Sequence, residues 1–262
     1  MEHATNAQDG VRVAFDVVGG GTPMLLVHGT GLSSAMWRDE GYVERLSGHH
    51  RLILVDMRGH GDSDKPHDET AYTMERLSSD LHAVLDQAGV DRAHLLGYSA
   101  GARIGFNFAV RHQDRLLSLL LGGGSAKSQH DEFDQVFFPG CIDVLDTGDM
   151  AEFLRRLAQA KGSAAATAAR AFLDADPQAM AAWFRAARDA PGLTDEQLAT
   201  IEVPTLLFAG SQDAPRLRDS LAAAQVMPHA RTVEIRGRDH MTTLAATRAI
   251  VSSVERFLAD LD

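Results

Sequence analysis

The sequence predicts an α/β protein built on a mostly parallel, doubly wound sheet. Short, continuous apolar runs of the kind found in strands buried on both faces recur along the chain, as in Pro23–Val27 and Arg51–Asp56. Longer runs with apolar residues at helical spacing, such as Met74–Ala88, lie between them. Several of the strand-like runs end in short polar loops. Strands that alternate with helices in this way indicate parallel strands joined by helical crossovers.

The predicted elements follow one another along the chain. Val11–Val18 is rich in β-forming residues and leads through three glycines into the strand Pro23–Val27. Ala35–Leu46 reads as a helix before the strand Arg51–Asp56, and Met74–Ala88 reads as a helix after it. The later predicted strands are Ala93–Tyr98, Leu116–Leu121, Pro204–Ala209 and Arg231–Ile235, and the later predicted helices are Arg103–His112 and Ala245–Leu258.

The alternation breaks between Ser125 and Thr200, where no strand-like run appears and glycines and prolines separate helix-like segments. Ala158–Arg188 is very rich in alanine, the best helix former. The bulky aromatic residues of this stretch are candidates for an apolar acyl pocket, although each could equally pack the segment onto the remaining protein. These candidates are Phe133, Phe137, Phe138, Trp183 and Phe184.

Composition excludes several classes of function. The formal net charge of −11 repels nucleic-acid backbones and anionic membrane surfaces, and no block of Lys or Arg offsets it. No stretch approaches the about 18 apolar residues of a membrane span. The first ten residues lack the apolar core of a secretory signal, and the single cysteine, Cys141, fits a reducing compartment. We therefore expect a cytoplasmic protein that binds neither nucleic acid nor membranes, with Cys141 as a core residue.

The most informative motif is Gly97-Tyr98-Ser99-Ala100-Gly101, which joins a predicted strand to a predicted helix. A serine at such a sharp turn is held in a strained backbone conformation, and side chains two residues before and after it would collide. The strain exposes the Ser99 hydroxyl and directs the Ala100 N–H toward a developing oxyanion. The motif therefore predicts a nucleophilic serine.

A serine nucleophile needs a base, and the base needs an orienting acid. His240 is the best base because it lies in a loop just before the closing helix, whereas His229 precedes the last predicted strand, at the wrong edge of the sheet. Asp213 ends the loop after Pro204–Ala209, whereas Asp219 falls inside the following helix-like run. Asp239 is adjacent to His240, and adjacent side chains seldom meet in the required geometry. The predicted triad is Ser99, Asp213 and His240.

Together with this motif, three further segments resemble the α/β-hydrolase superfamily: Leu25–Gly31, Pro204–Asp213 and Gly237–His240. The order Ser, Asp, His is the one that this family uses. The resemblance implies an eight-stranded sheet with a helical cap inserted after the sixth strand. The expected core is 1–124 and 201–262, and the expected cap is 125–200. The oxyanion hole is then expected from the backbone N–H groups of Thr30 and Ala100, with the Thr30 hydroxyl either adding a hydrogen bond or satisfying its own loop.

No metal or other cofactor is expected, because the twelve histidines show no metal-site spacing. The densest cluster of candidate ligands is Asp56, His60, Asp62 and Asp64. Its sequence resembles a loop that is structural in the α/β-hydrolase family.

The resemblance implies hydrolysis of a small, largely apolar carboxylic ester through an acyl-enzyme on Ser99. Serine at this position argues against haloalkane dehalogenases and epoxide hydrolases, which use a carboxylate. A lactonase and a hydrolase of carbon–carbon bonds in 1,3-dicarbonyl compounds stay open, as do a non-catalytic small-molecule receptor and a homodimer. Arg103, four residues after Ser99, is expected either to pair with a nearby carboxylate or to reach an acidic group of the substrate.

Overall fold

The computed structural model describes residues 1–128, 132–162, 172–173 and 175–261. Among them, eight strands form one sheet in the order β1-β2-β4-β3-β5-β6-β7-β8. β2 runs antiparallel to both of its neighbours, and all other neighbouring pairs are parallel. The strands are β1 (Glu2–Thr5), β2 (Arg12–Val18), β3 (Thr22–Val27), β4 (His50–Val55), β5 (Ala93–Tyr98), β6 (Leu116–Gly122), β7 (Thr205–Gly210) and β8 (Ala230–Ile235). The predicted mostly parallel α/β sheet is confirmed.

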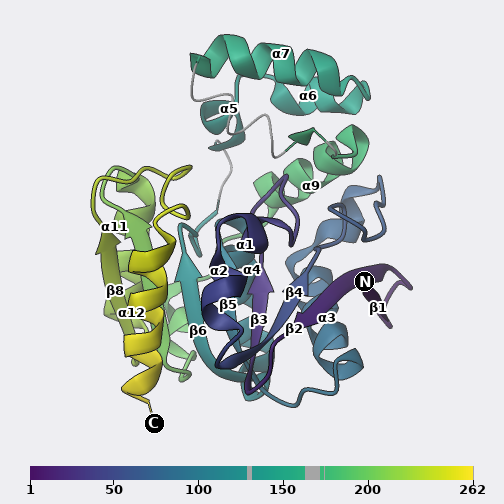
Figure 1. Ribbon diagram of the computed structural model, residues 1–262. Helices are drawn as coiled ribbons and strands as arrows, with labels where there is room; N and C mark the ends of the chain where they lie inside the picture. The colour runs from purple at the N-terminus through teal and green to yellow at the C-terminus, as the bar shows by residue number, and fades with distance from the viewer. Residues whose placement is uncertain (129–131, 163–171, 174, 262) are drawn as a thin grey trace.

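Helices cover both faces of the sheet (Figure 1). Successive β3 side chains alternate between two apolar clusters, with Met24 and Leu26 in one and Leu25 and Val27 in the other. The first cluster includes residues of α1 (Met36–Asp39), α2 (Tyr42–Leu46) and α12 (Thr247–Ala259). The second includes residues of α3 (Met74–Gln87), α4 (Ala100–His112) and α11 (Ala214–Val226). Two short 3₁₀ helices, η1 (Glu69–Tyr72) and η2 (Gln113–Arg115), complete this part of the chain.

The structure differs from the sequence prediction at two places near the N-terminus. The predicted helix Ala35–Leu46 is divided into α1 and α2 at Gly41, which has a φ of 76° and therefore leaves the helical conformation. β1 was not predicted, because four residues are too few to show a clear alternation of apolar and polar residues. Its pairing with β2, in which Glu2 lies opposite Phe15, makes it an edge strand.

The chain between β6 and β7 contains helices and no strand in its described residues. These helices are α5 (Glu132–Val136), α6 (Cys141–Asp146), α7 (Met150–Lys161), α9 (Pro177–Asp189) and α10 (Asp195–Ala199). In Figure 1, α5, α6, α7 and α9 stand above one end of the sheet. Cys141 is buried here, as predicted, and burial raises the pKa of its thiol to about 12. Part of the alanine-rich run 158–188, namely 163–171 and 174, lies outside the described residues.

The parallel strands place four loops at one edge of the sheet. β3, β5, β7 and β8 all end at this edge, and the loops that follow them carry Thr30, Ser99, Asp213 and His240. Open α/β sheets build their binding sites at the carboxyl ends of their strands. Among the described helices, none is both long and apolar enough to cross a lipid bilayer.

Candidate active site

Ser99 occupies the turn between β5 and α4. Its backbone has φ 55° and ψ −113°, and it is the one described non-glycine residue with a positive φ. An L-residue in such a conformation costs on the order of 1–3 kcal/mol, which the surrounding structure must offset. The strain that the sequence motif predicts is therefore present at the serine itself.

Gly97 and Gly101 make the turn sterically feasible. A Cβ atom added to Gly97 would lie 2.6 Å from the carbonyl oxygen of Gly101, and one added to Gly101 would lie 2.1 Å from the carbonyl oxygen of Val27. Both distances are far below van der Waals contact. Side chains at either position would force β5, α4 and β3 apart, so the collision predicted from the sequence is the reason for both glycines.

Three side chains from separate loops form a continuous hydrogen-bond relay. Ser99 Oγ lies 3.0 Å from His240 Nε2, and His240 Nδ1 lies 2.7 Å from Asp213 Oδ2. With a neutral imidazole, Nδ1–H donates to the carboxylate and Nε2 accepts from the serine hydroxyl. Asp213 is buried, whereas the His240 side chain is 30% exposed. The relay therefore runs from the protein interior to an accessible hydroxyl.

The alternative acids and the alternative base that the sequence offered, Asp219, Asp239 and His229, make other contacts. Asp219 forms ion pairs with Lys127 and Arg216 instead of contacting an imidazole. His229, at the amino end of β8, pairs with Glu202. The Asp239 carboxylate accepts hydrogen bonds from Thr242 in its own loop.

Two contacts hold in place the loops that carry Asp213 and His240. The Tyr98 hydroxyl donates to the main-chain carbonyl of His240, so the residue before the serine fixes the loop that carries the imidazole. The N–H of Gln212 donates to the carbonyl of Arg238 at 2.9 Å, which ties the loop after β7 to the loop after β8. The positions of Asp213 and His240 are thus set by the main chain as well as by their own hydrogen bond.

Thr30 and Ala100 border the same cavity as Ser99 and His240. Ala100 is the first residue of α4, where the helix leaves N–H groups without intrahelical partners and its dipole favours negative charge. The Thr30 hydroxyl accepts a hydrogen bond from the Trp183 indole N–H at 3.3 Å. It therefore joins its loop to α9, a contact that was not considered from the sequence.

Two buried histidines fix the loop that contains Thr30. His28 Nε2 accepts the N–H of Met57 at 3.1 Å, and His60 Nε2 accepts the N–H of Gly31 at 3.0 Å. Burial lowers the pKa of both imidazoles, that of His60 to about 3. Both are therefore neutral acceptors that link the Thr30 loop to the loop after β4.

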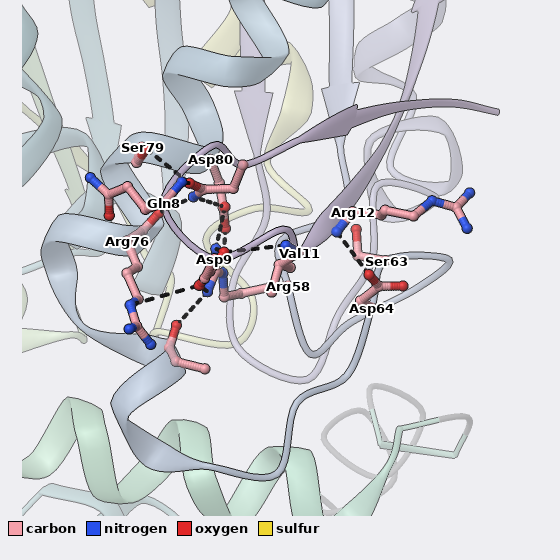
Figure 2. Close-up of polar contacts among 12 residues, drawn as sticks. Gln8, Asp9, Val11, Arg12, Arg58, Ser63, Asp64, Arg76, Ser79 and Asp80 are labelled. Atoms are coloured by element: carbon pink, nitrogen blue, oxygen red, sulfur yellow. Dashed lines mark hydrogen bonds and ion pairs between the residues drawn. The ribbon is translucent and has the colours of Figure 1, made fainter.

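The loop after β4 is itself anchored by Arg58, whose side chain is fully buried. Its guanidinium donates two hydrogen bonds to Asp80, at 2.7 and 2.6 Å, and two to Asp9, at 2.6 and 3.3 Å (Figure 2). Burial opposes its charge, yet these two carboxylates outweigh burial and raise the pKa of Arg58. Sequence reasoning missed this anchor, because Arg58 lies in the loop after β4, Asp80 on α3 and Asp9 in the turn between β1 and β2, all far apart in the sequence.

The acidic cluster singled out from the sequence has structural contacts. Asp56 accepts the N–H groups of Ser34 and Asp62, and Asp64 accepts the N–H of Arg12. Within the described part of the chain, no group of three or more His, Cys, Asp or Glu side chains is arranged to hold a metal ion.

A cavity of about 180 Å³ opens beside the Ser99 hydroxyl, and its wall is largely apolar. Phe133 and Phe137 line it, as does Phe172, which was not among the candidates. Phe184 lies behind this wall, with ring centroids 4.6 Å from Phe133 and 5.2 Å from Phe137. The other described residues of the wall are Gly29, Thr30, Leu32, Met36, Glu40, Tyr98, Ala100, Val136, Arg216, His240, Met241 and Leu244.

The remaining two pocket candidates also lie away from the described wall. Trp183 packs edge-on against His60 and Tyr72, at centroid distances of 4.8 and 5.7 Å. Phe138 packs against Phe153 at 5.3 Å. Both side chains are buried: Phe138 packs within the segment between β6 and β7, and Trp183 packs α9 against residues that follow β4.

The family model described as alpha/beta hydrolase fold matches residues 22–245. The chain belongs to this family. Similar curated proteins include "Putative carbamate hydrolase RutD" of Azorhizobium caulinodans, 29% identical over 84% of this chain and 85% of that protein. A 2-hydroxy-6-oxo-2,4-heptadienoate hydrolase of Pseudomonas putida is 28% identical over 97% and 95%. Among solved structures, an esterase from Thermogutta terrifontis has a TM-score of 0.82 and 25% identity, covering 100% of this chain and 99% of that one.

In this hydrolase, Arg103 makes contacts that were not considered from the sequence. Its guanidinium is buried and donates to the main-chain carbonyls of Lys127 and Ala190, the latter at 3.3 Å. Lys127 lies near the start of the segment between β6 and β7, and Ala190 lies just after α9. Arg103 therefore connects two parts of this segment to α4, the helix that follows Ser99.

Proposed function

We propose that this hydrolase cleaves carboxylic esters of small, largely apolar substrates through an acyl-enzyme on Ser99. The observation that carries the proposal is the unbroken relay from Asp213 through His240 to the Ser99 hydroxyl, which faces an apolar cavity. A nucleophile, its base and the group that orients the base are the components of acyl transfer.

Acylation begins when Ser99 Oγ attacks the carbonyl carbon of the ester and its proton passes to His240 Nε2. Asp213 accepts the Nδ1–H, which fixes the tautomer and stabilises the imidazolium. The N–H groups of Thr30 and Ala100 stabilise the oxyanion. The tetrahedral intermediate collapses, His240 gives its proton to the leaving alkoxide, and an alcohol departs. An ester between the substrate acyl group and Ser99 remains.

Deacylation repeats these steps with water. His240 Nε2 takes a proton from a water molecule as its oxygen attacks the acyl carbon, and the same two N–H groups bind the second oxyanion. When the intermediate collapses, the proton returns from His240 to Ser99 Oγ and the carboxylic acid leaves. The net reaction consumes one water per ester.

We further propose that 125–200 acts as a cap that selects the substrate. The relay residues and Thr30 lie on loops that follow strands of the sheet, and Ala100 begins α4, whereas Phe133, Phe137 and Phe172 of the cavity wall come from this segment. Arg103 and the contact between Trp183 and Thr30 couple the segment to the reacting groups. Chemistry and substrate choice are thus assigned to different parts of the chain.

A second candidate is hydrolysis of a carbon–carbon bond in a 1,3-dicarbonyl compound. It is favoured by the similarity to the Pseudomonas putida hydrolase, which extends over 97% of this chain and whose named substrate contains a ketone and no ester. Both reactions pass through an oxyanion at a carbonyl carbon, so the same serine and the same N–H donors would serve. The leaving group differs, since it is an alkoxide in one case and an enolate in the other.

A substrate panel with a matched serine variant tests the proposal. We expect many turnovers on 4-nitrophenyl acetate and butyrate, little on a linear 1,3-diketone, and labelling of Ser99 by a fluorophosphonate in mass spectrometry. Ser99→Ala should lose more than about 10³-fold in kcat/KM and all labelling. Ser252→Ala, at an exposed position on α12, is the control and should behave as the parent. Faster diketone cleavage would select the second candidate, and binding without turnover would indicate a receptor.

A further inference from the structure

The proposed oxyanion donor Thr30 lies between two glycines. Gly29 precedes it, and Gly31, which follows it, has a φ of 77°. Glycine adopts many backbone conformations at similar cost, so local sterics leave the direction of the Thr30 N–H weakly determined. An oxyanion donor is effective when it is already held in place before the charge develops. Contacts from other parts of the chain must therefore fix this loop.

Two aromatic side chains of the proposed cap contact this loop. A Cβ atom added to Gly31 would lie 2.7 Å from the ring of Phe172, so this ring packs directly against the main chain there. The indole N–H of Trp183 donates to the Thr30 hydroxyl at 3.3 Å. The Trp183 ring also packs edge-on against His60, the imidazole that accepts the Gly31 N–H. Trp183 therefore contacts both the donor residue and the side chain that holds the next residue.

The helix that carries Trp183, α9, is held on two sides. Arg185 of the same helix forms ion pairs with Glu69 of η1, at 2.9 Å, and with Asp146 of α6. Tyr72 of η1 packs against the Trp183 ring at a centroid distance of 5.7 Å. The helix is thus tied to the part of the chain that follows β4 as well as to the cap. It provides a fixed support for the loop that it contacts.

The hydrogen bond between Trp183 and Thr30 is costly to break. The Trp183 side chain is buried, and a buried N–H that loses its acceptor keeps the free-energy cost of its desolvation. The folded protein therefore favours the loop position in which the Thr30 hydroxyl meets the indole.

We propose that Trp183 is a positioning residue of the reaction. Its indole N–H holds the Thr30 hydroxyl and thereby directs the Thr30 main-chain N–H toward the oxyanion. Trp183 does not belong to the described cavity wall, so it acts through Thr30 and not on the substrate. This inference rests on the proposed ester hydrolysis and goes beyond substrate selection, because it gives the cap a part in the geometry of the oxyanion hole.

Removing either partner of the hydrogen bond should lower kcat with little change in KM, because the oxyanion forms only after the substrate has bound. Thr30→Val removes the hydroxyl at nearly constant size and leaves the main-chain N–H in place. Trp183→Phe removes the indole N–H and keeps an aromatic ring. We expect each variant to lose about 3- to 10-fold in kcat on 4-nitrophenyl butyrate, the range of one neutral hydrogen bond. Thr30→Ser keeps the acceptor and should recover most of kcat.

A double-mutant cycle shows whether Trp183 acts through Thr30. If it does, the double variant Thr30→Val, Trp183→Phe loses no more in kcat than either single variant. If the two side chains act separately, for example because the Thr30 hydroxyl itself binds the oxyanion, the two losses multiply. Multiplied losses would overturn the proposal, as would a kcat equal to that of the parent in both single variants.

Trp37→Phe is the matched control. Trp37 is the other tryptophan of the chain and is fully buried on α1. Its indole N–H has no hydrogen-bond partner among the described residues. The substitution therefore removes the same N–H and the same ring volume without breaking a bond to a loop, and kcat should stay within about twofold of the parent. An equal loss of kcat in Trp37→Phe and Trp183→Phe would mean that lost packing, and not the bond to Thr30, causes the effect.

Inhibition by a pair of ketones separates this proposal from the proposed function, because it needs no turnover. Ser99 adds to 1,1,1-trifluorohexan-2-one and its proton passes to His240, which gives a hemiketal oxyanion, whereas hexan-2-one binds as the uncharged ketone. The Ki of the trifluoro ketone should rise about 3- to 10-fold in Thr30→Val, in Trp183→Phe and in the double variant, and that of hexan-2-one should not change.

The combined outcomes are distinct. If no ester were hydrolysed but the trifluoro ketone showed these shifts, the proposed reaction would be wrong and the role of Trp183 would stand. Ester turnover with unchanged kcat and Ki in both single variants would have the opposite meaning. A protein that neither hydrolyses esters nor binds the trifluoro ketone more tightly than hexan-2-one would overturn both.

Discussion

The N–H of Gly31 donates a hydrogen bond of 3.0 Å to Nε2 of the buried His60. On the other side of the ring, Nδ1 lies 3.1 Å from the carbonyl of Arg58. The neutral tautomer with a proton on Nδ1 satisfies both partners at once. His60 thus connects the loop that carries Thr30 to the anchored loop after β4, and it is placed to position a proposed oxyanion donor without touching substrate.

Replacing His60 should therefore disturb the reaction more than substrate binding. His60→Leu leaves the Gly31 N–H buried without its acceptor, at a cost of about 1–3 kcal/mol in the free energy of unfolding. We expect kcat to fall at least about tenfold with a smaller change in KM, because the oxyanion forms only in the transition state. His60→Gln, whose amide oxygen can accept the same hydrogen bond, should recover much of kcat. Equal kcat in all three proteins would contradict this positioning role.

The lowered pKa of His60 predicts how stability depends on pH. Burial holds the folded imidazole near a pKa of about 3, whereas the unfolded one has the ordinary 6.5. Below pH 6.5 the unfolded chain takes up a proton that the folded protein does not, so the free energy of unfolding falls as the pH decreases toward 3. Between pH 7.5 and pH 5 this amounts to up to about 2 kcal/mol. Urea unfolding should show a weaker fall in His60→Gln than in the parent, and identical falls would refute the prediction.

Asp213→Asn tests the assignment of the orienting acid. The amide can donate to His240 Nδ1 and so favours the tautomer with a proton on Nε2, which cannot accept from Ser99. We expect kcat on 4-nitrophenyl butyrate to fall about 10⁴-fold with the fold retained in circular dichroism. Asp219→Asn, which changes the alternative acid considered from the sequence, should reduce kcat far less. A larger loss at Asp219 than at Asp213 would reverse the assignment.

The aromatic wall predicts a dependence on acyl length. Phe137→Ala should leave acetate esters nearly unchanged and reduce kcat/KM on longer chains, by up to about fourfold for each methylene that loses its contact. A series of 4-nitrophenyl esters from acetate to octanoate measures this slope. Phe184→Ala is the comparison, because Phe184 is fully buried behind the same wall. It should lower the free energy of unfolding by about 3–5 kcal/mol and affect all chain lengths similarly.

The sequence alone predicted those features of the fold and the site that depend on interactions between residues close together in the chain. The glycines flanking Ser99, the apolar runs of the parallel strands and the order of the loops predict a nucleophile turn at the carboxyl edge of an α/β sheet. Each of these signals depends on residues close together in the chain, where side-chain spacing and backbone sterics decide the outcome. The sequence also showed that His240 follows the last predicted strand and that His229 precedes it, which was enough to prefer His240. In the structure, His240 Nε2 lies 3.0 Å from Ser99 Oγ.

Tertiary structure alone decided which distant residues meet. Arg58 pairs with Asp80 and Asp9, which lie in two other parts of the chain. Phe137 and Arg216 lie in the cavity wall, whereas Trp183 packs against His60. Helical spacing shows which residues are apolar, but it does not tell which face of a helix meets a cavity and which meets a neighbouring helix. That choice depends on how the elements pack against one another, and packing is a property of the whole fold.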